Sequence, residues 1–160
     1  MRERRTACRR AMLAIVTSAT LVLGVAQAPS ASASDSYARK LLNIINRTRA
    51  HHDLRRLKME RSLNGPSRRH TADMIDANRL YDPRNLERLL ADYRWDDLGA
   101  DVVGCGNTLN ELHHILMTED FHRTILLHPK LRRVGIGALV ALDRNRCGRD
   151  SFWATEIMYG

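Results

Sequence analysis

The sequence lacks the short motifs that mark thiolate metal centres and serine nucleophiles. It has three cysteines among 160 residues, and none stands in a Cys-x-x-Cys or Cys-x-x-His spacing, which argues against a zinc site built on thiolates. No serine lies in a Gly-x-Ser-x-Gly sequence, so a hydrolase with a nucleophile elbow is not indicated. The sequence also has no internal repeat, and we therefore do not expect a repeat architecture.

The N-terminus has the pattern of a removable export signal. Five arginines come first, and residues 11–28 are uncharged. Polar and small residues interrupt this apolar stretch, which favours cleavage over a membrane anchor. Because a proline directly after Ala28 would hinder cleavage there, we expect a signal peptide over residues 1–33 and a mature chain over residues 34–160. An arginine pair in the signal also fits twin-arginine export, so both export routes stay open.

The mature chain is expected to be one modestly basic domain. Its length fits a single hydrophobic core, and removal of the signal lowers the net charge from +8 to +4. This charge favours loose attraction to anionic polymers or lipid headgroups. We expect a monomer without a membrane span after signal removal, secreted or held at the cell envelope, and no nucleic-acid partner.

The cysteines predict one disulfide. Cys8 leaves with the signal, and Cys105 and Cys147 remain. An even pair in an oxidising compartment is typical of a structural bridge. Closing a loop of about forty residues stabilises a fold by about 4 kcal/mol in the chain-entropy model.

Hydrophobic spacing predicts helices along the first part of the mature chain. Apolar residues recur every three to four positions over residues 37–50, the pattern of an amphipathic helix. A second helix is expected to begin at Pro66 and to end at Asn78. Its inner face would carry His70, Met74 and Ile75. Leucines between residues 83 and 93 indicate a short third helix.

Two more helices are expected further along. Residues 99–106 contain three glycines, which indicate close backbone approach or a tight turn more than a regular element. Thr108 and Glu111 then form a capping-box pattern before a helix. The buried face of that helix would carry Leu109, Leu112, His113, Leu116 and Met117. Thr118 would cap a last short helix that carries Phe121, His122, Ile125 and Leu126.

Two strands are expected at the C-terminus. Residues 134–140 and 152–158 read as strands, and the polar residues 143–150 join them. Helices followed by strands predict an α+β fold in which helices cover a small antiparallel sheet.

Four segments, in their order and spacing, are similar to one known family. They are Leu41–Ala50, Ala72–Tyr81, Leu112–Gly137 and Trp153–Glu156. Together they resemble the CAP superfamily of SCP-like extracellular domains, above all its short bacterial secreted members. The resemblance implies a three-layer α-β-α sandwich with a small, mainly antiparallel sheet. It also implies a cleft that gathers His and Glu side chains, which bind a divalent metal in some members.

This sequence departs from the family at the cleft. Where bacterial members have another histidine it has Asp82, and where they have Gly-Glu-Asn it has Gly99-Ala100-Asp101. Of the aligned cleft residues, only His122 is kept. A weak site of His122, Asp82 and Asp101 would suit zinc or a similar divalent metal, with His122 and Asp82 as its core ligands. Without such a metal we expect no cofactor.

The alternative interpretation of these residues is structural. His122 would be a half-buried helix residue whose ring nitrogen bonds a backbone carbonyl, and Asp82 would cap a helix that starts at Pro83. His113 and His114 cannot share one helix face, so at most one turns inward, as a second cleft ligand or as a core residue. The arginine pairs are either solvated faces or a polyanion-binding surface; they stand at 55–56, 68–69 and 132–133.

Three functions remain open at this stage. The first is a non-enzymatic exported domain that binds a lipid, a wall polymer or a protein at the envelope. The second is a metal-assisted hydrolase using His122, Asp82 and Asp101, in which the metal lowers the pKa of a bound water. The third is a structural or antigenic surface protein without a small ligand. We favour the first, because the scaffold motifs are kept while the cleft is depleted.

Overall fold

The computed structural model describes residues 31–93 and 98–160. Residues 1–30 of the expected signal peptide 1–33 lie outside the described residues, and cleavage after Ala33 stays a prediction. Within the described ranges, no helix is both long enough and apolar enough to cross a membrane.

A four-stranded mixed sheet forms the middle layer, in the order β1-β3-β4-β2. The edge strand β1 (Lys58–Met59) runs parallel to β3 (Arg133–Asn145). β4 (Gly148–Tyr159) is antiparallel to β3 on one side and to the other edge strand, β2 (Gly99–Gly106), on the other side. The sheet is therefore small and mainly antiparallel, as expected.

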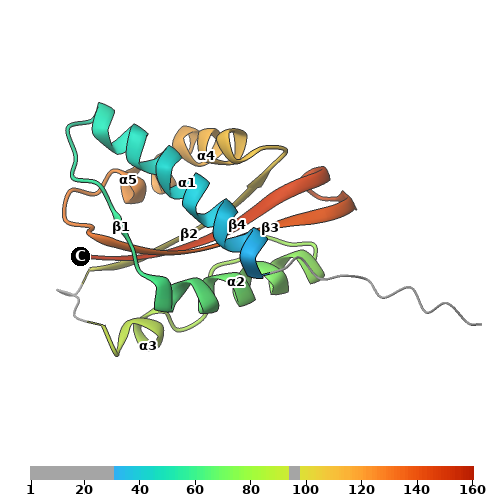
Figure 1. Cartoon of the computed structure of the whole chain (residues 1–160), viewed down its shortest axis with the longest axis horizontal. Coiled ribbons are helices and arrows are strands. Elements are labelled where there is room, and N and C mark those ends of the chain that lie inside the picture. Colours follow the sequence, from blue (N-terminus) through green and yellow to red (C-terminus); the bar gives the residue numbers. More distant parts are fainter. Residues whose placement is uncertain (1–30, 94–97) are drawn as a thin grey trace, which may run out of the picture.

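Helices cover both faces of the sheet (Figure 1). α1 (Ala31–His51), α4 (Leu109–Thr118) and α5 (Asp120–Leu126) lie on one face. α2 (Arg61–Asp76) and α3 (Leu86–Leu90) lie on the opposite face. The predicted α+β sandwich of three layers is confirmed.

The C-terminal hairpin is longer than expected. The predicted strands 134–140 and 152–158 lie inside β3 and β4, but both strands continue into the polar segment 143–150 and leave only a short turn. A register shift after Ala141 separates the buried part of the hairpin from this polar end.

The prediction of an irregular segment at 99–106 was wrong, because these residues form β2 and pair with β4 along their whole length. The close backbone approach was right. A Cβ atom on Gly104 would lie 2.9 Å from Leu116 Cδ2, and one on Gly106 would lie 2.8 Å from Leu112 N. The glycines let α4 pack directly on the strand.

Helix α2 begins before the expected start at Pro66 and buries a different set of side chains. The buried residues are Leu63, Ser67, Thr71 and Met74, whereas His70 and Ile75 are half-buried. The cause lies in β3, where a Cβ atom on Gly135 or Gly137 would overlap α2. The helix therefore packs against strand backbone, and small side chains fit there. Ser67 Oγ donates to Gly135 O at 3.2 Å, and Thr71 Oγ1 donates to Gly137 O at 3.0 Å.

Two predicted helix ends are confirmed. Thr108 caps α4, because its Oγ1 accepts a hydrogen bond from Glu111 N at 3.0 Å. Asn78 follows the end of α2 in the left-handed region, with φ 46°, and its N–H donates to Ile75 O at 2.9 Å. The buried face of α4 is also as expected, except that Met117 is only half-buried.

Two predicted caps were wrong. The residue before α5 is Glu119, one position after Thr118. Asp82 caps no helix, because α3 begins only after Asn85. Asn85 has φ 58°, and this left-handed residue interrupts any helical path that starts at Pro83.

The predicted disulfide is present. Cys105 near the end of β2 is bonded to Cys147 in the β3–β4 turn, with Cα atoms 6.0 Å apart and a sequence separation of 42. The bridge ties the polar end of the hairpin to the edge of the sheet.

Candidate functional site

The three predicted site residues come from three different elements around the edge strand β2. Asp101 lies on β2, His122 lies on α5, and Asp82 lies in the link between α2 and α3. Asp82 and Asp101 line one hollow, and Asp82 and His122 line a second. The structure therefore brings the three residues to one region, with Asp82 between the other two.

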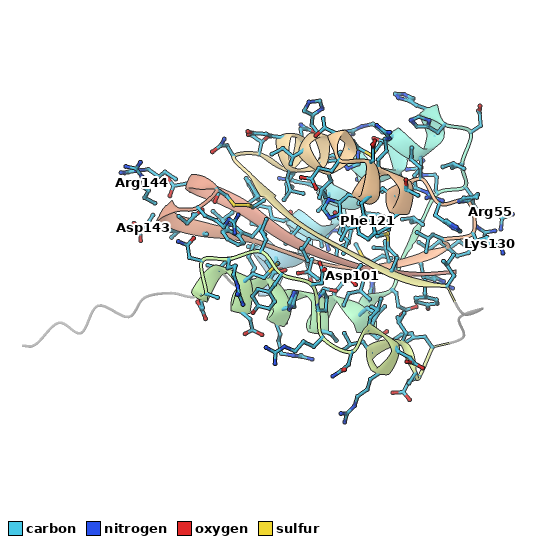
Figure 2. All side chains as sticks on the ribbon, turned by 180° about the vertical axis from the view of Figure 1, so that it is seen from behind. Arg55, Asp101, Phe121, Lys130, Asp143 and Arg144 are labelled. Atoms are coloured by element: carbon cyan, nitrogen blue, oxygen red, sulfur yellow. A yellow bond between two sulfur atoms is a disulfide. The ribbon has the colours of Figure 1, made fainter. Side chains whose placement is uncertain are left out.

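The first hollow, which we call the apolar hollow, has a volume of about 330 Å³ and lies between β2, α5 and α3. Aliphatic side chains make most of its wall: Leu86, Leu98, Ile125 and Leu131. Phe121 of α5 also lines it and remains 71% exposed. Figure 2 shows Phe121 and Asp101 on the same side of the molecule.

The two carboxyl groups give the apolar hollow a titratable polar end. Burial and, to a smaller extent, the negative charge of Asp82 together raise the pKa of Asp101 to about 6. Both effects disfavour the charged form of the Asp101 carboxyl group. Asp101 therefore takes up a proton in mildly acidic solution and remains mostly ionised at neutral pH.

The second hollow, which we call the histidine cleft, has a volume of about 530 Å³ and follows β2 toward the disulfide. The Nδ1 atom of His122 lies 2.7 Å from Glu119 Oε2, close enough for an ion pair, although the geometry makes no hydrogen bond. His122 is half-buried, as the structural interpretation expected, but its contact is with a carboxylate and not with a backbone carbonyl.

Sequence reasoning missed Glu119 and Arg146, which also line the histidine cleft. Glu119 stands three residues before His122, a spacing that places two side chains on one helix face. That Glu-x-x-His spacing was the signal that could have identified it. Arg146 belongs to the hairpin turn, and no local pattern connects it to α5.

The donor set does not form a ready-made metal site. Among residues 31–93 and 98–160, no group of three or more His, Cys, Asp or Glu side chains could hold a metal ion together. Asp101 and His122 line different hollows, and the Nδ1 atom of His122 faces Glu119. A metal held by His122 and Asp82 therefore stays a prediction.

His113 turns inward and His114 is exposed, as the spacing required. His113 Nε2 lies 2.7 Å from Thr48 Oγ1 of α1, so this ring bridges two helices of the core. Burial lowers the pKa of His113 to about 4, helped by the positive charges of His114 and Arg47. These contacts assign His113 to the core and not to the histidine cleft.

Comparison with known proteins agrees with the observed fold. The model of the cysteine-rich secretory protein family, CAP, matches residues 42–156. The fold is similar to that of an extracellular protein with an SCP domain from Bacillus anthracis, with a TM-score of 0.60 and 17% identity over 79% of this chain and 41% of that one. No curated protein matches.

Two further structures have a similar fold. An outer surface protein from Borrelia burgdorferi has a TM-score of 0.61 and 13% identity, over 79% of this chain and 96% of that one. A cysteine-rich secretory protein from Staphylococcus aureus has a TM-score of 0.56 and 20% identity, over 80% of this chain and 40% of that one. The chain thus spans less than half of the Bacillus and Staphylococcus chains, and these likenesses concern the fold alone.

Proposed function

Because this chain belongs to the cysteine-rich secretory protein (CAP) family, we propose that it is an exported, non-enzymatic domain that binds a lipid-like ligand in the apolar hollow beside β2. The observation that carries the proposal is a hollow with a mainly aliphatic wall and the exposed ring of Phe121 at its side. Concave apolar sites with a few polar groups are the usual form of small-ligand sites, and exposed aromatic surface beside them favours binding.

The two carboxyl groups narrow the ligand class. An anionic headgroup beside Asp82 and Asp101 is repelled, whereas an ammonium group is attracted. Thr124 and His128 also line the hollow and offer hydrogen-bonding groups. The ligand proposed is therefore an amphiphile with an alkyl body and a neutral or cationic polar end, in preference to a wall polyanion.

Export is part of this proposal and rests on three observations. The N-terminus has the pattern of a signal peptide. Cys105 and Cys147 are joined, which fits an oxidising compartment. The Bacillus and Borrelia proteins of similar fold are described as extracellular and outer surface proteins. We therefore place the mature domain outside the cytoplasm, secreted or at the envelope.

One observation supports the second candidate, a metal-assisted hydrolase. A carboxylate that faces one nitrogen of an imidazole orients the ring, and it leaves the other nitrogen for a metal. Glu119 faces Nδ1 of His122 in this way, and Asp82 lines the same cleft. A metal there would supply a water of lowered pKa. The purified protein would then contain metal in stoichiometric amount, and His122→Ala would remove it.

Binding in the apolar hollow is tested with two fluorescent probes of equal chain length, an alkylammonium and an alkanoate. Phe121→Ala should weaken alkylammonium binding about tenfold or more, because burial of one aromatic side chain contributes about 1.5–3 kcal/mol. Leu142→Ala is the matched control, since Leu142 is also 71% exposed. Its neighbours Asp143 and Arg144 lie at the end of the hairpin that is distant from Phe121 (Figure 2).

Three results would contradict the proposal. The first is binding no stronger than that of an unrelated basic protein. The second is an equal loss of binding in the Phe121 and Leu142 variants. The third is a preference for the alkanoate probe at pH 7.5, where both carboxylates should repel it.

A further inference from the structure

A third hollow, with an excess of basic side chains, lies at the other edge of the sheet, beside β1. We call it the arginine pocket; its volume is about 660 Å³. Its charged and amide side chains come from α1 and from the first half of α2: Asp35, Arg39, Asn43, Arg61, Asn64 and Arg68. The start of α1 passes over α2 in Figure 1, and the pocket is formed where these two helices and β1 meet.

The three guanidinium groups of this pocket have no carboxylate partner in the part of the chain that the structure describes. The ion pairs found there involve other residues: His122 with Glu119, Arg123 with Asp120 and Arg133 with Glu60. Glu60 precedes Arg61 but accepts hydrogen bonds from Ser62 Oγ at 2.7 Å and from Tyr159 Oη at 3.0 Å. Only Asp35 brings a negative charge to the pocket wall. The pocket therefore has an excess of positive charge.

The amide of Asn64 adds a donor to the same wall. Its Oδ1 accepts a hydrogen bond from Ile136 N at 2.9 Å, so the oxygen is committed to the β3 backbone. The NH2 group is left without a hydrogen-bond partner in the described chain and can only donate. Leu42 and Met59 complete the lining with apolar surface.

We propose that the arginine pocket binds a phosphate group, either of a small phosphate ester or of a phospholipid headgroup. A guanidinium presents parallel N–H donors that match phosphate oxygens in pairs, and Arg61 and Arg68 stand on the same helix while Arg39 approaches from α1. The hollow is larger than one phosphate, so it also has room for the substituent of an ester. This site shares no residue with the apolar hollow, and it does not depend on the function proposed above.

The test uses the mature domain, with glycerol 3-phosphate as the free ester and vesicles of phosphatidylglycerol in phosphatidylcholine as the headgroup source. The double variant Arg61→Gln/Arg68→Gln should weaken binding about tenfold or more, because each replacement removes charge-assisted hydrogen bonds to the phosphate oxygens. The matched control is Arg55→Gln/Arg56→Gln, which removes the same charge from an exposed pair outside the pocket. Arg61→Lys/Arg68→Lys keeps the charge and should restore only part of the affinity.

The outcomes separate the two phosphate sources. Arginine-dependent binding of glycerol 3-phosphate supports a site for soluble esters, and arginine-dependent binding of vesicles alone supports a headgroup site. The proposal is overturned if neither probe binds, or if the Arg55 and Arg56 control loses as much affinity as the pocket variant. Thermal unfolding of each variant verifies that the fold is kept.

Discussion

Glu156 should make the stability of this protein fall as the solution becomes alkaline. The residue lies on β4, opposite Ile136 of β3 and Val102 of β2, and is completely buried. Neither carboxyl oxygen has a hydrogen-bond partner in the described chain. Burial raises the pKa of Glu156 from 4.5 to about 8, because a charge without partners is costly in an apolar core.

The sign and size follow from proton linkage. Between pH 4.5 and about 8 the unfolded chain releases the Glu156 proton while the folded chain keeps it, so the free energy of unfolding falls as pH rises. At about 1.4 kcal/mol per pH unit, the whole window corresponds to about 5 kcal/mol. Asp101 has a pKa of about 6 in the folded chain, and His113 has a pKa that falls from 6.5 to about 4 on folding. A comparison with a Glu156 variant cancels their contributions, and the Glu156 effect between pH 6.5 and 8 is then about 2 kcal/mol.

The assay is urea unfolding at a series of pH values for the wild type and for Glu156→Gln, which has nearly the same size and no charge. The wild type should lose about 2 kcal/mol more than the variant between pH 6.5 and 8. Glu156→Leu should remove the same slope while also removing the unpaired polar atoms. Parallel stability curves for wild type and Glu156→Gln would refute the reasoning, since they would mean that Glu156 is ionised or solvated in the folded protein.

Three other measurements test the remaining structure. Replacing Cys105 and Cys147 by serine should lower the free energy of unfolding by about 4 kcal/mol. His113→Gln should reduce the loss of stability on acidification from pH 6.5 to 4, because the pKa of His113 is lowered to about 4 and the unfolded chain takes up a proton first. Gly137→Ala should cost about 3 kcal/mol, because its Cβ atom would overlap α2; Gly65→Ala, with its nearest neighbour at 3.6 Å, is the control.

The position and the buried side of a helix can be predicted from the sequence when its buried residues are apolar and recur at helical spacing. In α4 the leucines recur on one face and Thr108 caps the first turn, so both its position and its buried side were expected. In α2 the contact is with strand backbone at Gly135 and Gly137, and the inner side chains are small and polar. Apolar residues do not recur at helical spacing on such a face. The strand residues that it contacts are about seventy positions away in the chain.

The candidate site also has a part that could be predicted from the sequence and a part that could not. The resemblance to a family places Asp82 and Asp101 in one region, and the structure agrees that they line one hollow. The same reasoning expected Phe121 on the last helix only as one of its apolar residues. The helix buries Leu126, whereas Phe121 stays exposed beside the hollow. This exposure, on which the proposed function depends, cannot be derived from spacing.

The net charge of the chain does not reveal that it has two surfaces of opposite charge. The apolar hollow with Asp82 and Asp101 borders β2, and the arginine pocket borders β1, and these are the two outer strands of the sheet. Exposed charges separated by more than about 10 Å are largely screened at ordinary ionic strength, so each surface responds mainly to its own residues. The cationic amphiphile proposed for one edge and the phosphate proposed for the other should therefore not compete. A modest net positive charge is compatible with both, because a net charge does not show how the individual charges are distributed over the surface.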